Sequence, residues 1–236
     1  MATAGGPLIL TPTAGERDAI QQSCAAGDAQ AIPGWAASIQ LCGFGQVVAA
    51  ARTSQLIAEH RPSEVWLLGI AGVYAQHVDA VPIGSAAAFG TVFCHGIGVG
   101  EGRSYQSSGA MGFHQWPYSN PPIGDRIDQQ FEPTPSQQRL GRVDQQWARR
   151  GLLSVCSAAA NREEAETRQQ AFPESIAEEM EGMGVAAACQ LASVPWTIVR
   201  GISNVAGDRD HQRWQIKPAL EAVVQLLDSL ALVGKP

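Results

Sequence analysis

Charged side chains are scarce in this 236-residue chain, where Asp, Glu, Lys and Arg together make up 16% of the residues and the net charge is −6. The sequence has no basic stripe that would neutralise phosphate groups, which argues against a nucleic-acid partner. It also begins without a basic segment followed by an apolar run, so we expect no signal peptide and a cytoplasmic protein. A chain of this length predicts one domain over residues 1–236 with a sizeable core.

Cysteine and histidine are few and scattered. The odd number of cysteines and the absence of a CxxC pair predict free, buried thiols in a reducing compartment; the five are Cys24, Cys42, Cys94, Cys156 and Cys189. The five histidines form no HExxH motif, so we expect neither a metal site nor a cofactor. The stretch 80–100 is uncharged, but Pro82, His95 and five glycines interrupt it, which indicates buried strands and turns and no contact with a membrane.

Short apolar runs and helical patterns alternate along most of the chain. Buried strands are expected at Pro7–Thr11, Ala36–Cys42, Glu64–Gly69, Val81–Val92, Leu152–Ser157, Ile176–Met180 and Pro195–Arg200. Helices are expected at Ala14–Ala26, Gln46–Glu59, Ser136–Arg150, Asn161–Gln170 and Gly182–Leu191, and at a C-terminal stripe of Ile216, Ala219, Leu220, Val223, Leu227 and Leu230. This alternation predicts a three-layer α/β/α sandwich around a mostly parallel sheet.

Two regions do not follow this alternation. The glycine-dense loop 96–102 lacks GxGxxG spacing and a following helix, so it does not indicate a dinucleotide site. Residues 103–135 are polar and rich in proline, which predicts a long irregular excursion over the surface.

Two polar clusters stand at the ends of apolar stretches and carry most of the functional signal. The first is Glu179-Met180-Glu181-Gly182, and the second is Arg200-Gly201-Ile202-Ser203-Asn204. In an open α/β sheet, ligands bind at the carboxyl ends of the strands, so we expect both clusters at one binding site.

The segments Phe172–Glu181 and Ile198–Asn204 resemble those of the nucleoside phosphorylase and nucleosidase superfamily. Within it, the extension Val205–Asp210 and Trp214 are most similar to the futalosine hydrolases, relatives of the methylthioadenosine/S-adenosylhomocysteine nucleosidases. The resemblance implies a purine nucleoside phosphorylase-like fold, a homo-oligomer of two or more subunits, and water and a purine nucleoside as substrates. It also implies hydrolysis of futalosine to hypoxanthine and dehypoxanthine futalosine, a step of menaquinone biosynthesis.

The resemblance assigns roles to two carboxylates that the reaction needs. Glu16 lies in the first turn of the first helix, where the family places its water-activating glutamate. Glu181 would bind the 2′- and 3′-hydroxyls of the ribose, and its charge would favour a cationic sugar in the transition state. Met180 would pack against the flat face of the sugar. Without the resemblance, Glu16 reads as a helix-dipole carboxylate and Glu181 as a surface residue.

Asn204 stands where the adenine-cleaving nucleosidases carry aspartate. An amide cannot deliver a proton, but its NH₂ group can donate to N7 and O6 of a 6-oxopurine, which favours hypoxanthine over adenine as the leaving base. Asp208 and Asp210 would hold Asn204 or contact the base, or form a solvated turn. Arg200 would orient Glu181 or the attacking water, or pair with a core carboxylate. Glu179 is expected among the residues that bind the base and the rest of the substrate.

The remaining substrate contacts follow from two glycine-rich turns. Phe44 lies in a Gly-Phe-Gly turn, and Ala71 and Gly72 belong to Gly69-Ile70-Ala71-Gly72, whose backbone would lie along the base and ribose. Ile70 replaces a serine that helps to hold phosphate in the phosphorylases, which favours water as the second substrate. The alternatives left open are a phosphorylase, a nucleosidase acting on methylthioadenosine, S-adenosylhomocysteine, aminodeoxyfutalosine or inosine, and a non-catalytic nucleoside-binding protein.

Overall fold

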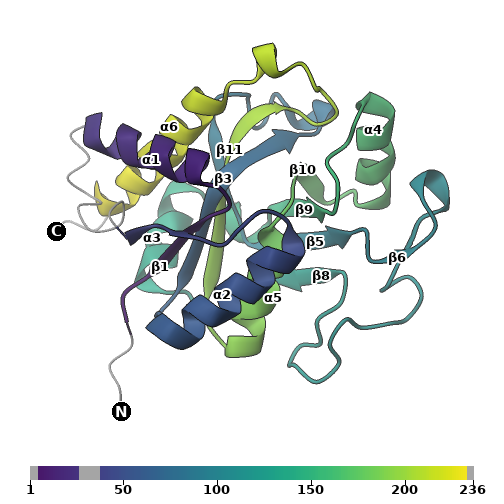
Figure 1. Cartoon of the computed structure of the whole chain (residues 1–236), viewed down its shortest axis with the longest axis horizontal. Helices are drawn as coiled ribbons and strands as arrows, with labels where there is room; N and C mark the ends of the chain where they lie inside the picture. The colour runs from purple at the N-terminus through teal and green to yellow at the C-terminus, as the bar shows by residue number, and fades with distance from the viewer. Residues whose placement is uncertain (1–4, 27–37, 233–236) are drawn as a thin grey trace.

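A twisted sheet forms the centre of the computed structural model, which describes residues 5–26 and 38–232 (Figure 1). Nine strands of the described residues belong to this sheet. They are β1 (Leu8–Thr11), β2 (Gln40–Leu41), β3 (Val65–Val73), β4 (Ala86–Phe89), β5 (Thr91–His95), β8 (Arg126–Asp128), β9 (Gly151–Val155), β10 (Ser175–Glu179) and β11 (Trp196–Val205). Two further short strands, β6 (Gly98–Val99) and β7 (Gln106–Ser107), pair with each other in a separate hairpin.

The strand order is β2-β1-β3-β10-β9-β5-β8, and β11 joins β3 on one side and β4 on the other. Pairing is parallel between β1 and both β2 and β3, between β3 and β11, and between β9 and both β5 and β10. Antiparallel pairing is limited to β3–β10, β4–β11 and β5–β8. The predicted mostly parallel sheet is therefore confirmed. It consists of one parallel block of β1, β2, β3 and β11 and another of β5, β9 and β10, which meet at the antiparallel pair β3–β10.

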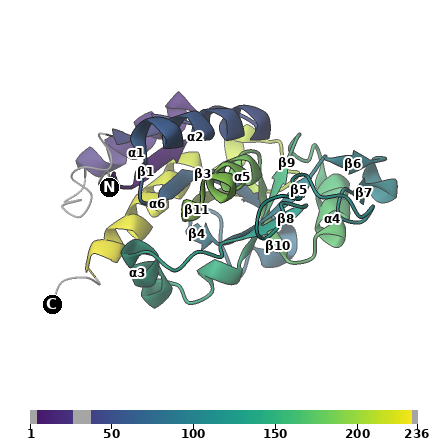
Figure 2. The same ribbon diagram turned by 90° about the horizontal axis from the view of Figure 1, so that it is seen from below.

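Helices cover both faces of this sheet. They are α1 (Ala14–Ala26), α2 (Gln46–His60), α3 (Pro135–Val143), α4 (Arg162–Ala171), α5 (Gly182–Ala192) and α6 (Ile216–Leu232). In both Figure 1 and Figure 2, α2 lies beside α5 and α1 lies beside α6. The alternation of side chains along β3 explains the two layers, because Val65 and Leu67 face the core under α2 and α5 whereas Trp66 and Leu68 face the core under α1, α3 and α6. The three-layer α/β/α sandwich is thus confirmed.

Several expected boundaries differ from the structure. Strand β11 continues to Val205 and β3 to Val73, because β3 and β11 pair with each other over this whole length. β11 continues through its polar residues because the buried side chains of Arg200, Ser203 and Asn204 form hydrogen bonds inside the protein. The expected helix 136–150 instead ends at Val143 and is followed by a turn and a short 3₁₀ helix at Trp147–Arg149.

Smaller corrections concern single segments. Only Gln40–Leu41 of the second expected strand is a strand, and Ala36 and Ala37 lie outside the described residues. Residues 81–85 form turns before β4. The region 103–135 carries β7 and β8, and β8 adds an edge to the main sheet.

Two expectations about burial were wrong in part. Ile216 is 41% exposed, although the other members of the C-terminal stripe are buried. The five cysteines are free as predicted, but Cys156 is exposed. None of the helices in the described part of the chain is long and apolar enough to cross a membrane.

Candidate active site

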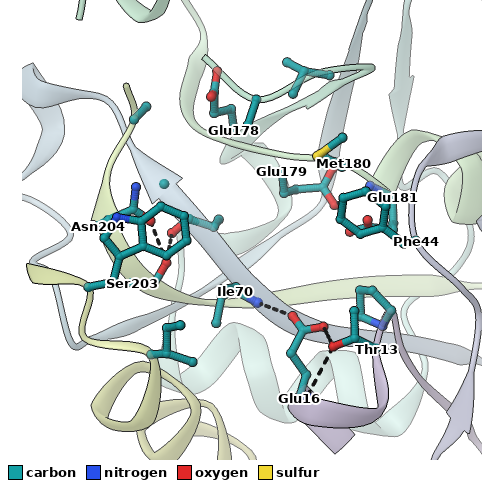
Figure 3. A pocket seen from close by; sticks show the side chains of 18 of the residues that line it. Thr13, Glu16, Phe44, Ile70, Glu178, Glu179, Met180, Glu181, Ser203 and Asn204 are labelled. Atoms are coloured by element: carbon teal, nitrogen blue, oxygen red, sulfur yellow. Dashed lines mark hydrogen bonds between the residues drawn. The ribbon is translucent and has the colours of Figure 1, made fainter. Parts of the chain in front are cut away.

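A cavity of about 440 Å³ opens where β1, β3, β9, β10 and β11 end (Figure 3). Eight of the residues predicted for the site line it: Glu16, Phe44, Ala71, Gly72, Glu179, Met180, Glu181 and Asn204. Arg200 and Asp208 are not among its lining residues. The carboxylates of Glu16 and Glu181, which are far apart in sequence, therefore share one cleft with the amide of Asn204.

Glu16 is held by a local motif at the start of α1. The Thr13 hydroxyl donates a hydrogen bond to Glu16 Oε2 (2.6 Å) and accepts one from the Glu16 backbone N–H (3.3 Å). The backbone N–H of Ile70 donates to Glu16 Oε1 (3.1 Å). Each oxygen accepts one bond, so lone pairs remain for a water molecule in the cavity. Thr13 was missed, although the spacing Thr-x-x-Glu before a helix is a capping signal.

Glycine at position 69 allows this arrangement. A Cβ atom on Gly69 would lie 2.7 Å from Glu16 Oε1 and 2.1 Å from Arg200 Nη1. Both contacts are shorter than any real Cβ tolerates, so β3 must lack a side chain at this point. The bare backbone lets Glu16 and the Arg200 guanidinium both approach β3 where the side chain of another residue would lie.

Glu181 lies near Phe44 and across the cavity from Asn204 in Figure 3, and it is 4% exposed. The backbone N–H of Gly45 donates to its Oε1 (3.0 Å), and Arg200 Nη2 donates to its Oε2 (3.2 Å). Gly45 has φ of 83°, a conformation that favours glycine and turns its N–H toward Glu181. Burial raises the pKa of Glu181 to about 7, and the neighbouring Glu179 adds to the rise while Arg200 opposes it.

Glu179 is fully engaged with the protein. Its carboxylate accepts hydrogen bonds from the backbone N–H groups of Glu181 (2.9 Å) and Gly182 (2.8 and 2.9 Å), from the Ser154 hydroxyl and from Arg200. A carboxylate offers about four acceptor sites, so little capacity remains for a ligand. Glu179 caps the N-terminus of α5 and fixes the backbone that carries Glu181.

Arg200 does not end its strand, as was expected, but lies in the middle of β11 with no exposed surface. Its Nη2 atom donates to both Glu179 and Glu181, whereas its Nε and Nη1 atoms have no hydrogen-bond partner. A buried guanidinium needs such carboxylates to offset its lost hydration. Of the alternatives for Arg200, the structure shows that it pairs with Glu179 and positions Glu181.

Asn204 follows an irregularity in β11 that places one extra residue, Ser203, between Ile202 and Asn204. The Ser203 hydroxyl donates to Asn204 Oδ1 (2.7 Å), and Asn204 Nδ2 donates to the backbone carbonyl of Val205 (2.9 Å). A long contact of 3.4 Å joins Nδ2 to the carbonyl of Asp208. One N–H of the amide is therefore firmly held, and donation by the other to a purine requires the long Asp208 contact to be exchanged.

Asp208 thus contacts Asn204 through its backbone. Its carboxylate instead pairs with Arg213 (3.0 Å), which is 69% exposed. The Asp210 carboxylate also pairs with Arg213 (3.1 Å). The Asp208 carbonyl in addition accepts a hydrogen bond from the indole N–H of Trp214 (3.0 Å), which ties the rim of the cavity to the Asn204 segment.

The lining of the cavity carries more acidic than basic side chains. Glu16, Glu178, Glu179 and Glu181 line it, and Arg209 and His211 are the basic side chains among its lining residues. Arg200 lies behind this surface. Such a lining favours a substrate that develops positive charge and disfavours a phosphate ion. Glu178 was missed, because a pair of adjacent glutamates in a strand does not reveal which one faces a ligand.

Comparison with known proteins shows which family the chain belongs to. The chain matches the Phosphorylase superfamily over residues 30–232. This match covers most of the sequence, and the chain belongs to that superfamily.

Individual relatives are nucleosidases. The chain is 37% identical over 70 residues to a futalosine hydrolase of Acidothermus cellulolyticus, a match that covers 30% of this chain and 29% of that protein. It is 27% identical over 168 residues to a 5′-methylthioadenosine/S-adenosylhomocysteine nucleosidase of Aeromonas salmonicida, covering 70% of this chain and 66% of that protein. The chain thus spans less than a third of the first relative and about two thirds of the second.

Similarity to solved structures supports the same fold. A 5′-methylthioadenosine/S-adenosylhomocysteine nucleosidase of Colwellia psychrerythraea, solved in complex with adenine, superimposes with a TM-score of 0.72. The superposition covers 98% of this chain and 96% of that chain at 17% sequence identity. At this identity the likeness concerns the fold alone.

Proposed function

We propose that the protein hydrolyses the N-glycosidic bond of a purine ribonucleoside, and that its substrate is futalosine. The observation that supports this most directly is the single cavity into which Glu16, Glu181 and Asn204 all project. The reaction consumes one nucleoside and one water and releases the free base and the sugar. The similarity to a futalosine hydrolase suggests the substrate, and that relative is matched over only part of its length.

The sugar binds between the two carboxylates. Glu181 accepts hydrogen bonds from the ribose hydroxyls, because each of its oxygens keeps lone pairs beyond those used by Gly45 and Arg200. As the C1′–N9 bond breaks, the ribose becomes oxocarbenium-like, and the negative charge of Glu181 stabilises it. Glu16 accepts a proton from the attacking water while the water oxygen forms a bond to C1′.

The electron pair of the broken bond moves into the purine. Asn204 donates an N–H to the base and stabilises this charge, and the base takes its proton from solvent because an amide has none to give. The backbone carbonyls of Val205 and Asp208 can only accept, so they fix which end of the amide is the donor. A water nucleophile suits the anionic lining better than phosphate does, since Ile70 supplies only a backbone N–H and that group is bound to Glu16.

Base release decides between this proposal and its rivals. Free base is measured from futalosine, inosine and methylthioadenosine, each with and without inorganic phosphate. We expect release of hypoxanthine from futalosine at the same rate in both conditions. Phosphate-dependent cleavage of inosine would identify a phosphorylase, comparable cleavage of methylthioadenosine an adenine-type nucleosidase, and binding without release a nucleoside-binding protein. A homo-oligomer stays a prediction, which sedimentation of the purified protein tests.

A further inference from the structure

Glu178 is a buried carboxylate that lines the cavity and has no part in the mechanism above. It is 5% exposed and lies at the far side of the cavity from Glu16 (Figure 3). Three donors of the protein surround it: the backbone N–H of Ala159 (2.8 Å), the Tyr74 hydroxyl (3.2 Å) and Arg168 Nη1 (3.4 Å). Placing a carboxylate in this position costs hydration, and these contacts offset it.

The register of the sheet places Glu178 and Asn204 on either side of Gly72. Glu178 is paired with Gly72 on one side of β3, and Asn204 is paired with the same Gly72 on the other side. Neighbouring strands lie roughly 4.8 Å apart, so the two residues flank a gap of about two strand spacings. Gly72 has no side chain between them, and a Cβ there would meet the Ala206 backbone at 3.2 Å and Asn204 Nδ2 at 3.4 Å.

A base bound over Gly72 would meet a donor on one side and an acceptor on the other. Asn204 offers an amide N–H, and Glu178 offers carboxylate lone pairs, of which only three are used by Ala159, Tyr74 and Arg168. The backbone N–H of Ala159 is already bound to Glu178 and is not free to donate to a base. This side of the cavity therefore offers the carboxylate of Glu178 as an acceptor.

We propose that Glu178 determines the base specificity of the site by accepting a hydrogen bond from N1–H of a 6-oxopurine. This inference rests on the proposed function, because it assumes that a purine lies beside Asn204. A 6-oxopurine carries a hydrogen on N1, and this N1–H group can donate a hydrogen bond to a carboxylate oxygen. A 6-aminopurine presents a lone pair at N1, which faces the carboxylate without a hydrogen bond and leaves both groups unpaired.

The experiment measures binding of three free bases, hypoxanthine, 1-methylhypoxanthine and adenine, by calorimetry. The variants are Glu178→Gln, which keeps the shape and exchanges an acceptor oxygen for a donor, and Glu174→Gln as a matched control. Glu174 lies four residues earlier, pairs with Arg126 and has a side chain that is 62% exposed, outside the cavity. Hydrolysis of futalosine and inosine is assayed on the same preparations.

In the wild-type protein and in Glu174→Gln we expect hypoxanthine to bind at least about tenfold more tightly than either other base. In Glu178→Gln this preference narrows to within about threefold, and the affinity for adenine rises because the new amide donates to its N1. Equal binding of hypoxanthine and 1-methylhypoxanthine by the wild-type protein overturns the proposal without any variant. An unchanged preference in Glu178→Gln overturns it as well, since the discrimination is then steric.

These outcomes separate the inference from the proposed function. If nucleosides are cleaved but Glu178→Gln does not change the base preference, the proposed hydrolase is supported and the proposed role of Glu178 is wrong. If no nucleoside is cleaved but the base preference depends on Glu178, the proposed base site is supported and the proposed hydrolase is wrong.

Discussion

The two ends of the cavity are built in different ways. At the sugar end, Glu181 is held by Gly45 and Arg200, which are 136 and 19 residues away in sequence. At the base end, Asn204 is held by Ser203, Val205 and Asp208, all within four residues. The sugar end therefore depends on the packing of several elements, whereas the orientation of Asn204 is set by one short segment. Glu181, the proposed ribose-binding carboxylate, is therefore harder to alter than Asn204, the proposed base contact, whose surroundings can change locally.

Glu16→Gln tests the sugar end by its chemistry, and we expect the largest effect here. An amide cannot accept the proton of the attacking water, so kcat falls by about 10²–10⁴-fold while binding of the free base is retained. Base release and hypoxanthine affinity are measured in parallel. Asp18→Asn, in the same helix and with a 53% exposed side chain, is the control and should keep wild-type kcat. A kcat within threefold of wild type would remove Glu16 from the mechanism.

Arg200→Met tests the sugar end by its structure. The change leaves the buried Glu179 and Glu181 without their cation, and we expect the free energy of unfolding to fall by about 3–5 kcal/mol. Urea denaturation followed by fluorescence measures it. Arg213→Met removes a guanidinium from exposed ion pairs and should cost at most about 1 kcal/mol. Equal losses in the two variants would show that the buried cluster contributes no more than a surface pair.

Asn204→Ala tests the base end. Removing a donor to the developing charge should lower kcat/KM by about 10²–10³-fold, while the free energy of unfolding changes by less than about 1.5 kcal/mol because the lost contacts are local. Kinetics on futalosine and denaturation of the same sample check both halves. A large loss of stability would contradict the contrast between the two ends.

The pH dependence of kcat/KM tests the difference between the two ends of the cavity without a mutation. Because burial raises the pKa of Glu181 to about 7, the carboxylate becomes neutral below that pH and loses its charge and part of its acceptor capacity. We expect kcat/KM to fall about tenfold per pH unit on the acid side of 7 and to level off above it. Binding of hypoxanthine, which does not touch Glu181, should stay constant over the same range. A profile that is flat down to pH ~5 would contradict it.

Asp208→Ala should have the smallest effect. The residue orients Asn204 through its backbone carbonyl, which the substitution keeps, and its side chain contacts only the exposed Arg213 and the backbone N–H of Asp210 in the described part of the chain. We expect kcat/KM within about threefold of wild type, in line with the small energies of surface ion pairs. A loss comparable to that of Asn204→Ala would assign the carboxylate a direct part in base binding.

The fold was largely predictable because apolar runs along the chain mark the strands. The polar clusters near strand ends indicated where the cavity lies, whereas the roles of Glu16, Glu181 and Asn204 were inferred from the family resemblance and stay predictions. The role of Arg200 was harder to predict. Its polarity suggested the end of β11, but its partners Glu179 and Glu181 belong to another part of the chain, and their proximity depends on the packing of β10 against β9 and β3.

The position of Glu178 was not predictable for a related reason. Glu178 and Glu179 are adjacent, and only the pairing of β10 with the end of β3 places Glu178 opposite Gly72. That pairing joins segments about 100 residues apart, and its antiparallel direction breaks the parallel pattern of the sheet. The direction of the Asn204 amide depends on carbonyl groups of its own turn, whose geometry no residue pattern gives.

The extra residue at Ser203 makes the length of β11 as important as its composition. Deleting this extra residue would let Ile202 and Asn204 follow each other directly opposite Ala71 and Gly72, and would remove the local bend and twist of the strand. Asn204 would keep Gly72 as its partner, but it would lose the contact with the Ser203 hydroxyl and the strand geometry that now directs its amide into the cavity. Insertions and deletions in this segment are therefore more damaging than substitutions, and libraries for altering the base preference should vary residue types while keeping the spacing fixed.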